Sequence, residues 1–298
     1  MKRCARLLTV LFACAGLSAF VQAQPLSGTL KKIKDTGVIK VGHRDASIPF
    51  SYLDDKQQPI GYSMELCARI VDAVKVELKM PKLKVELVPV TSQTRVPILT
   101  GGNIDMECGS TTNSKERQKQ VSFAFTTFYT GTKLLVKKAS GIKSYKDLKG
   151  KTVAVTQGTT NERAIKGLND KDNLGMSFIH AKDHNESFLT VDTGRAVAFP
   201  MDDILLYSLV ASSKNPGEWT IVGEFLSDDP YGIMIRRDDP QWQEFVNKVI
   251  GGLMKSGEIR KIYAKWFQAP IPPKGVNLNV PISTKLEGLI KNPNNEGA

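Results

Sequence analysis

The sequence predicts an α/β protein of two lobes, each a mostly parallel sheet flanked by helices, joined by two hinge strands. The chain has 298 residues, a length typical of about two domains. Strand-like and helix-like patterns alternate in two separate blocks, which favours a parallel sheet covered by helices in each block. The last amphipathic helices lack strands of their own, so we expect them to pack back on the first lobe.

Residues 1–23 have the pattern of a signal peptide. Basic residues, including Lys2 and Arg3, precede an apolar run from Leu7 to Phe20, which is too short for a membrane-spanning helix. We expect cleavage after Ala23 and a periplasmic location. The alternatives are a single membrane anchor and a lipoprotein.

The mature chain keeps a basic balance. The formal net charge is +11, and removal of three basic residues with the leader leaves 38 basic against 30 acidic residues, or +8. Such a balance can indicate a nucleic acid, a membrane surface or an acidic ligand. Export and the lack of a long Lys/Arg block argue against nucleic acid. A content of 41% hydrophobic and 24% charged residues excludes disordered, collagenous and multi-span membrane proteins.

Four cysteines are present, and Cys4 and Cys14 leave with the leader. Cys67 and Cys108 remain in an oxidising compartment, where a disulfide can form. Cys67 falls in an expected helix and Cys108 at an expected strand end. The sequence leaves open whether they are bridged or are two buried thiols.

The first lobe is expected to start with a helix closed by Gly37 and a strand at 38–41. A helix capped by Ser63 follows and ends at Pro81. The alternation of Leu83, Val85 and Leu87 with charged residues then predicts a strand. A short helix and a strand complete the block, at 96–99 and 104–107.

The second block begins at an apolar strand, 133–136, and a capping-box pattern from Ser144 to Asp147. Strands and helices then alternate at 153–155, 160–168, 176–179, 186–193, 196–199, 203–211 and 219–222.

The chain then returns through a strand at 231–235 and two helices, one beginning at Asp239-Pro240 and one at 259–267. We expect the tail to lie on the surface or to be partly disordered. The expected boundaries are 24–131 and 227–275 for the first lobe, 132–226 for the second and 276–298 for a C-terminal extension.

Motifs for catalysis and metal binding are weak. Gly150-Lys151-Thr152 resembles the end of a P-loop, but Tyr145 stands where a glycine is required. No GxSxG motif supports a hydrolase. His180 and His184 are four residues apart but straddle a strand end and a loop. We therefore expect no metal and no cofactor.

Polar clusters follow the strands of both blocks, at the sheet edge where open α/β folds bind ligands. Any one of them could be only a helix cap or a solvated surface, but together they predict a cleft between the lobes. The clusters are His43-Arg44, Thr91 to Arg95, Gly109 to Thr112 with Arg117, Thr156 to Thr160, His180 to His184, and Met201 to Asp203.

Five segments resemble the family-3 extracellular solute-binding proteins. They are VGHRDASIPFSY, the run from Pro89 to Phe128, TVAVTQGTTNE, AKDHNESF and GRAVAFPMDD. The resemblance extends from about Leu30 to Pro273. It implies a type II periplasmic-binding fold, hinge closure on L-glutamate or L-aspartate, and delivery to the membrane subunits of an ABC permease. It implies no catalytic role, and we expect a monomer.

The resemblance also implies roles for individual residues. Arg117, Thr160, Thr112 and Ser110 match residues that hold a ligand's α-carboxylate. Asp202 matches the acid that holds the α-ammonium, together with Ser110.

The family residues that surround the ligand's side-chain carboxylate are matched here by Arg44, Ser92, Arg95 and His184. A closed cleft needs a partner for each ligand charge. The extra arginines are expected for a ligand with a second acid group, and they would penalise a ligand whose side chain is neutral or cationic.

Two other classes of protein remain open at this stage. One is an exported enzyme on the same scaffold, similar to cyclohexadienyl dehydratase, with Glu107 as the nearest candidate acid. The other is a sensor or adaptor without a transport partner. The preference between glutamate and aspartate stays undetermined.

Overall fold

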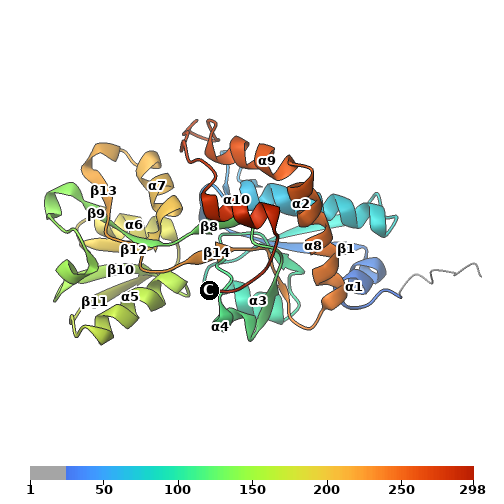
Figure 1. The fold of residues 1–298 in the computed structure, drawn as a ribbon, viewed down its shortest axis with the longest axis horizontal. Helices are drawn as coiled ribbons and strands as arrows, with labels where there is room; N and C mark the ends of the chain where they lie inside the picture. Colours follow the sequence, from blue (N-terminus) through green and yellow to red (C-terminus); the bar gives the residue numbers. More distant parts are fainter. Residues whose placement is uncertain (1–24) are drawn as a thin grey trace, which may run out of the picture.

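The structure is a computed structural model that describes residues 25–298. The predicted signal peptide, its cleavage after Ala23, and Cys4 and Cys14 lie outside the described residues. Two five-stranded sheets with helices packed on them form two lobes (Figure 1). The α/β, two-lobed fold class is confirmed. Within residues 25–298, the helices lack a stretch with the length and hydrophobicity that a bilayer-spanning segment requires.

The first sheet has the strand order β5-β1-β6-β15-β7. β1 runs parallel to β5 and β6, as the strand–helix alternation predicts, whereas β15 returns antiparallel between β6 and β7. β5 forms an edge of the sheet, and its Val85 and Leu87 are exposed. The strands are β1 (Val38–His43), β5 (Lys84–Pro89), β6 (Met106–Glu107), β7 (Val121–Phe123) and β15 (Met234–Arg236).

The helices of this lobe differ from expectation mainly at their ends. Gly37 closes the first helix in a left-handed conformation, as expected, with φ of 70°. Gly61, rather than Ser63, caps the second helix, which ends at Glu77 before Pro81 is reached. Ser63 lies inside the helix and donates to the Gly109 carbonyl at 2.8 Å. The helices are α1 (Gly28–Thr36), α2 (Tyr62–Glu77), α3 (Arg95–Thr100), α4 (Lys115–Gln118), α8 (Pro240–Lys255) and α9 (Glu258–Phe267).

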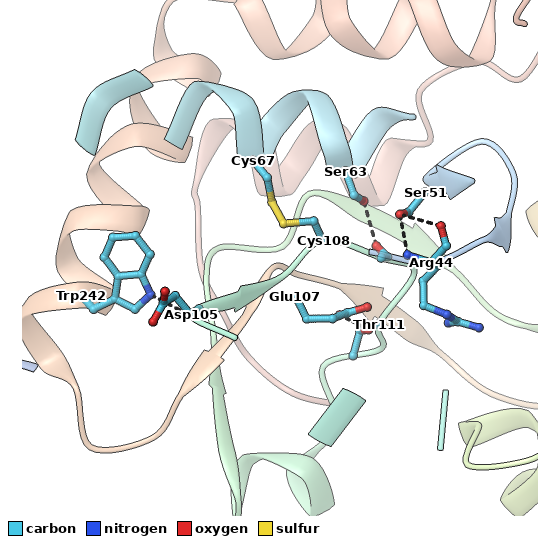
Figure 2. Close-up of a disulfide and its surroundings, with 10 residues drawn as sticks. Arg44, Ser51, Ser63, Cys67, Asp105, Glu107, Cys108, Thr111 and Trp242 are labelled. Carbon is cyan, nitrogen blue, oxygen red and sulfur yellow. Dashed lines mark hydrogen bonds between the residues drawn. A yellow bond between two sulfur atoms is a disulfide. The ribbon is translucent and has the colours of Figure 1, made fainter. Parts of the chain in front are cut away.

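A short antiparallel sheet accompanies the first lobe, with strands β2 (Ala46–Ser47), β3 (Ser51–Leu53) and β4 (Pro59–Ile60). The disulfide that the sequence left open is present between Cys67 of α2 and Cys108, which follows β6 (Figure 2). The two Cα atoms are 6.3 Å apart. The bridge therefore ties α2 to the start of the polar cluster after β6.

The second sheet has the order β11-β10-β12-β9-β13. β10 is parallel to β11 and β12, and β9 is antiparallel to β12 and β13. The expected capping box at Ser144 is present but starts a 3-10 turn. The strands are β9 (Thr132–Lys137), β10 (Thr152–Thr156), β11 (Ser177–Ala181), β12 (Ala198–Asp202) and β13 (Trp219–Val222). The helices are α5 (Thr160–Lys171), α6 (His184–Asp192), α7 (Asp203–Ser212) and the 3-10 turns η1 (Lys138–Ser140), η2 (Tyr145–Leu148) and η3 (Pro216–Glu218).

Two strands connect the lobes. β8 (Phe128–Thr130) and β14 (Asp229–Tyr231) pair antiparallel and run between the two sheets (Figure 1). Phe128 and Tyr231 also contribute to an aromatic cluster with Phe50 and Phe267 in the first lobe. The connection is therefore anchored on one lobe.

The C-terminal extension differs from the expectation of a surface tail or partial disorder. It forms α10 (Thr284–Lys291), whose Leu286 and Ile290 are buried. α10 packs on α8 and β8. Leu286 and Ile290 are four residues apart, so they lie on one face of the helix and give this otherwise polar segment an apolar surface to bury. The chain then continues to a position beside α4 (Figure 1).

Candidate functional site

A small cavity lies between the lobes, where strands of both sheets end. Its volume of about 10 Å³ is close to what a single water molecule needs, so the lining side chains close almost completely around it. Only Met201 and Leu205 of its lining residues are apolar. The others are Ser92, Arg95, Ser110, Thr112, Thr159, Thr160, Asn161, His184 and Asp202. Two larger hollows elsewhere are lined mainly by apolar side chains.

Chain topology explains why these residues meet. Parallel strands bring their carboxyl ends to one edge of each sheet, and helices begin there. Arg95 opens α3, and Thr160 and His184 open α5 and α6. Asp202 ends β12, and Ser110 follows β6 by three residues. The two lobes turn these edges toward each other.

One group of side chains joins the lobes directly, and we call Thr112, Arg117, Thr160 and Asp202 the cross-lobe cluster. Arg117 Nη1 donates to the Thr112 carbonyl at 2.8 Å, and Nη2 donates to the Gly158 carbonyl of the second lobe at 3.1 Å. The hydroxyls of Thr112 and Thr160 are 3.2 Å apart. Burial, followed by the charge of Arg95, lowers the pKa of Arg117 well below its usual value.

Gly158 allows this close approach. Its φ is +76°, and a Cβ there would lie 2.7 Å from the Cα of Gln93 in the first lobe. Any other residue would meet both a strained backbone and a backbone contact. The arrangement is therefore a closed one, in which the lobes touch around the cavity.

Asp202 is buried and accepts two hydrogen bonds. Asn161 Nδ2 donates to Oδ1 at 2.9 Å, and the Tyr231 hydroxyl donates to Oδ2. Burial, followed by the nearby charge of Asp229, raises the pKa of Asp202 to about 8. A cationic group entering the cavity would favour the ionised carboxylate.

A second group, which we call the arginine cluster, consists of Arg44, Ser92, Arg95 and His184. Arg44 is fully buried, and burial followed by the charge of Arg95 lowers its pKa to about 10. Arg95 Nη1 donates to Thr111 Oγ1, whose hydroxyl donates to the carboxylate of Glu107 at 2.5 Å. Glu107 thus supports Arg95 through Thr111 (Figure 2 shows Glu107 and Thr111 side by side).

His184 projects from the first turn of α6. Its Nδ1 lies 3.1 Å from Thr156 Oγ1, which is 2.7 Å from Ser187 Oγ. Burial, followed by the charges of Arg44 and Arg95, holds the pKa of His184 well below its usual value. The imidazole is therefore neutral at pH 7 in this closed arrangement.

Unpaired polar atoms concentrate around the cavity. Among residues 25–298, eight buried side-chain nitrogen or oxygen atoms have no hydrogen-bond partner, and five belong to predicted site residues. They are Arg44 Nη1, Ser92 Oγ, Arg95 Nε, Ser110 Oγ and His184 Nε2. Because buried polar groups are normally paired, this concentration indicates a place for a polar ligand.

The structure brings seven of the nine predicted site residues into the cavity lining: Ser92, Arg95, Ser110, Thr112, Thr160, His184 and Asp202. Arg44 and Arg117 are buried next to it but do not line it. What each residue binds stays a prediction.

Sequence reasoning missed several supporting residues. Asn161 and Tyr231 hold Asp202, and Thr111 connects Arg95 to Glu107. Thr111 lies inside one of the polar clusters and Asn161 directly follows another, so their positions gave some signal. Tyr231 gave no such signal, because it falls at the start of an expected strand, 231–235, and outside the polar clusters.

The weaker candidates fall elsewhere. His180 lies in β11 and contacts Lys166 and Glu162, away from the cavity. Among the residues that the structure describes, no group of three or more His, Cys, Asp or Glu side chains could hold a metal ion. Thr152 begins β10, so the Gly150-Lys151-Thr152 motif starts a strand and not a phosphate loop.

Comparisons of sequence place this chain among transport proteins. The profile of the bacterial extracellular solute-binding proteins, family 3, matches residues 39–269. The L-glutamate/L-aspartate-binding protein of Pseudomonas aeruginosa is 53% identical over 293 residues, covering 98% of this chain and 97% of the relative. A glutamate/aspartate import solute-binding protein of Escherichia coli is 47% identical, covering 99% and 98%.

Solved structures agree with the fold. A mutant of ArgBP from T. maritima superposes with a TM-score of 0.72 at 30% identity, covering 80% of this chain and 99% of that one. The ancestral amino acid-binding protein AncCDT-1, a precursor of cyclohexadienyl dehydratase, gives a TM-score of 0.67 at 32% identity, with coverages of 80% and 99%. This chain therefore belongs to the bacterial extracellular solute-binding proteins, family 3.

Proposed function

We propose that this protein captures L-glutamate and L-aspartate between its lobes and delivers them to the membrane subunits of an ABC permease. Three relatives that are 47% to 53% identical are named as glutamate/aspartate-binding or glutamate/aspartate import proteins. The observation that carries the proposal is the arginine cluster, in which buried donor atoms of Arg44, Ser92, Arg95 and His184 lack partners. A ligand with a second carboxylate satisfies them.

The cross-lobe cluster would hold the part common to all amino acids. Arg117 would bind the α-carboxylate as a guanidinium fork, with the backbone N–H at the start of α5 near Thr160 and groups of Ser110 and Thr112. Asp202, with Ser110, would bind the α-ammonium. Arg44, Ser92, Arg95 and His184 would bind the side-chain carboxylate.

The two strands that connect the lobes allow ligand binding to be coupled to transport through closure of the lobes. A ligand that contacts both lobes stabilises the closed arrangement over an open one, and closure marks the loaded protein for a permease. We propose that the lobes comprise residues 24–131 with 227–275, and 132–226. We also propose that the leader is cleaved after Ala23 and that a periplasmic monomer performs this work, independently of nucleic acid.

The enzyme alternative has less support. The candidate acid Glu107 is bonded to Thr111 behind the cavity and does not line it. Family membership points to solute binding rather than to turnover. Purified protein incubated with prephenate or arogenate should leave both unchanged, and conversion of either would support the enzyme.

The direct test is isothermal titration of the purified protein, stripped of bound ligand, against the twenty common amino acids. Glutamate and aspartate should bind at least tenfold more tightly than glutamine and asparagine. Equal affinity for acids and amides, or binding of a cationic amino acid alone, would refute the proposal. Co-purification with a permease would distinguish a transport protein from a sensor.

A further inference from the structure

The last five residues of the described chain contact the loop that carries Arg117. The Ala298 N–H donates to the Asn113 carbonyl, and the Lys115 N–H donates to the Ala298 carbonyl, both at 3.0 Å. Side chains add to this pairing. Asn113 Nδ2 and Gln118 Nε2 donate to the Asn295 carbonyl at 2.9 and 3.0 Å. The terminal segment thus covers both ends of α4.

The same loop is attached to the hinge on its other side. The Asn113 N–H donates to the Pro230 carbonyl of β14 at 2.7 Å, and Thr112 forms a bridge with Tyr231. Asn113 therefore uses its N–H toward the hinge and its carbonyl toward Ala298. The terminal segment becomes the outer member of a backbone ribbon that also contains β14 and β8.

The extension is fastened to the hinge at further points. The Thr126 N–H, just before β8, donates to the Asn294 carbonyl at 2.9 Å. Lys285 of α10 donates to Asp228 at 2.8 Å and to the Tyr129 hydroxyl at 3.0 Å. These contacts place the extension across both connecting strands and onto the α4 loop.

Arg117 depends on the geometry of this loop. Its guanidinium donates to the Thr112 carbonyl, and its N–H donates to the Ser114 hydroxyl at 3.3 Å. Within this loop, α4 (Lys115–Gln118) is a single helical turn, which has little stability of its own. Support from outside is needed to keep a buried guanidinium in one orientation.

We propose that residues 294–298 position Arg117 for the α-carboxylate, through Asn113 and Gln118, without touching the ligand. The segment lies beyond the part of the chain that matches the family profile, which ends at residue 269. The inference rests on the proposed function, because it assigns to Arg117 the group that all amino acids share. Its effect is therefore the same for glutamate and for a weakly bound glutamine.

Two variants remove the support in different ways. A chain ending at Asn292 lacks the contacts of residues 294–298 but keeps α10. Gly297→Leu keeps the chain length but places a side chain where even a Cβ would be 3.0 Å from the Lys115 nitrogen. Gly288→Leu is the matched control, since a Cβ at Gly288 in α10 meets nothing within 4 Å.

Isothermal titration should show roughly 5- to 30-fold weaker glutamate binding for both variants, the range typical of residues that act through a neighbour. Glutamine affinity should fall by the same factor, and Gly288→Leu should stay within about twofold of the parent. In an Arg117→Lys background, removal of the segment should cause no further loss, because the fork it positions is already absent.

The outcomes separate the two proposals. A parent protein that binds no acidic amino acid refutes the proposed function. A parent that binds, with unchanged affinity in both variants, refutes the positioning role. Losses that persist in the Arg117→Lys background, or that track a lowered melting temperature in the Gly297→Leu protein, mean general support of the fold and also refute it.

Discussion

The two groups of side chains around the cavity differ in how much of their bonding is already complete. In the cross-lobe cluster, Arg117 donates to carbonyls of both lobes, and Asp202 accepts from Asn161 and Tyr231. In the arginine cluster, every member has a buried polar atom without a partner. The first group is held by bonds within the protein, and the second keeps buried polar atoms that no other described residue pairs.

This difference separates affinity from specificity. A group that is already oriented loses little conformational freedom when a ligand binds, which favours tight binding of any amino acid. Unpaired buried donors instead discriminate between ligands. A ligand that cannot accept their hydrogen bonds leaves them buried without a partner, which costs binding free energy. Substitutions in the cross-lobe cluster should thus affect all amino acids, and those in the arginine cluster mainly the acidic ones.

The largest effect is expected from Arg117→Ala. A ligand carboxylate buried without its partner costs about 3–5 kcal/mol, or roughly 100- to 5000-fold in affinity. Isothermal titration should show that loss for glutamate, aspartate and glutamine alike, whereas Lys115→Ala on the exposed side of the same helix should bind normally. Near-normal affinity of the Arg117 variant would contradict the assignment.

Arg95→Ala and Arg44→Ala test whether the arginine cluster recognises the ligand's side chain. We expect each to weaken the binding of glutamate and aspartate by about 2–4 kcal/mol, roughly 30- to 1000-fold, and that of glutamine far less. Binding curves for the three ligands measure the ratio, with the surface residue Arg69→Ala as control. If all three ligands lose equally, these arginines do not read the side chain.

His184→Leu is expected to have a smaller effect. The neutral imidazole can supply one hydrogen bond to a carboxylate, so glutamate should bind roughly tenfold more weakly. His180→Leu, four residues away on β11, should change the affinity by less than about twofold. Titration of both variants tests the assignment, and equal losses would remove His184 from the site.

The weakest expected effect is a pH dependence from Asp202. Its pKa is raised to about 8 in the closed ligand-free protein, against about 4 in an unfolded chain. Between these values the folded protein binds an extra proton at this carboxyl, so its contribution to stability is present at low pH and is lost as pH rises toward 8.

Thermal melts of the parent and of Asp202→Asn measure this contribution. Relative to the variant, the ligand-free parent should lose melting temperature between pH 5 and pH 8, at about 2–4 °C for each kcal/mol of lost stability. The contributions of groups distant from Asp202 cancel in this difference. A parent that gains stability over the variant on going to pH 8 would show that Asp202 is ionised without a ligand.

The spacing of apolar residues predicted much of the fold. The regular alternation from Val153 to Val222 predicted the strands β10 to β13 and the α-helices between them, because local spacing decides whether a segment has a face to bury. The ends of helices and the end of the chain were less predictable. Ser63 looked like a cap, but Gly61 took that place, and the tail was ordered by Leu286 and Ile290 reaching a surface far away in sequence.

The site was predictable where function needs a particular side chain at a strand end. Seven of the predicted residues line one cavity because parallel topology brings strand ends together. Residues that act on other residues were not predictable. Tyr231 and Glu107 read as ordinary strand residues, and their contacts with Asp202 and Thr111 exist only after folding.

The two-lobed class, the polar edges and the family resemblance could be predicted from the amino-acid sequence, since all three depend on local pattern and residue type. The pairing of Cys67 with Cys108, the closed contact at Gly158 and the attachment of the last residues to the Arg117 loop became visible in the folded chain. These features join segments distant in the chain, and no local spacing encodes which distant surfaces will meet.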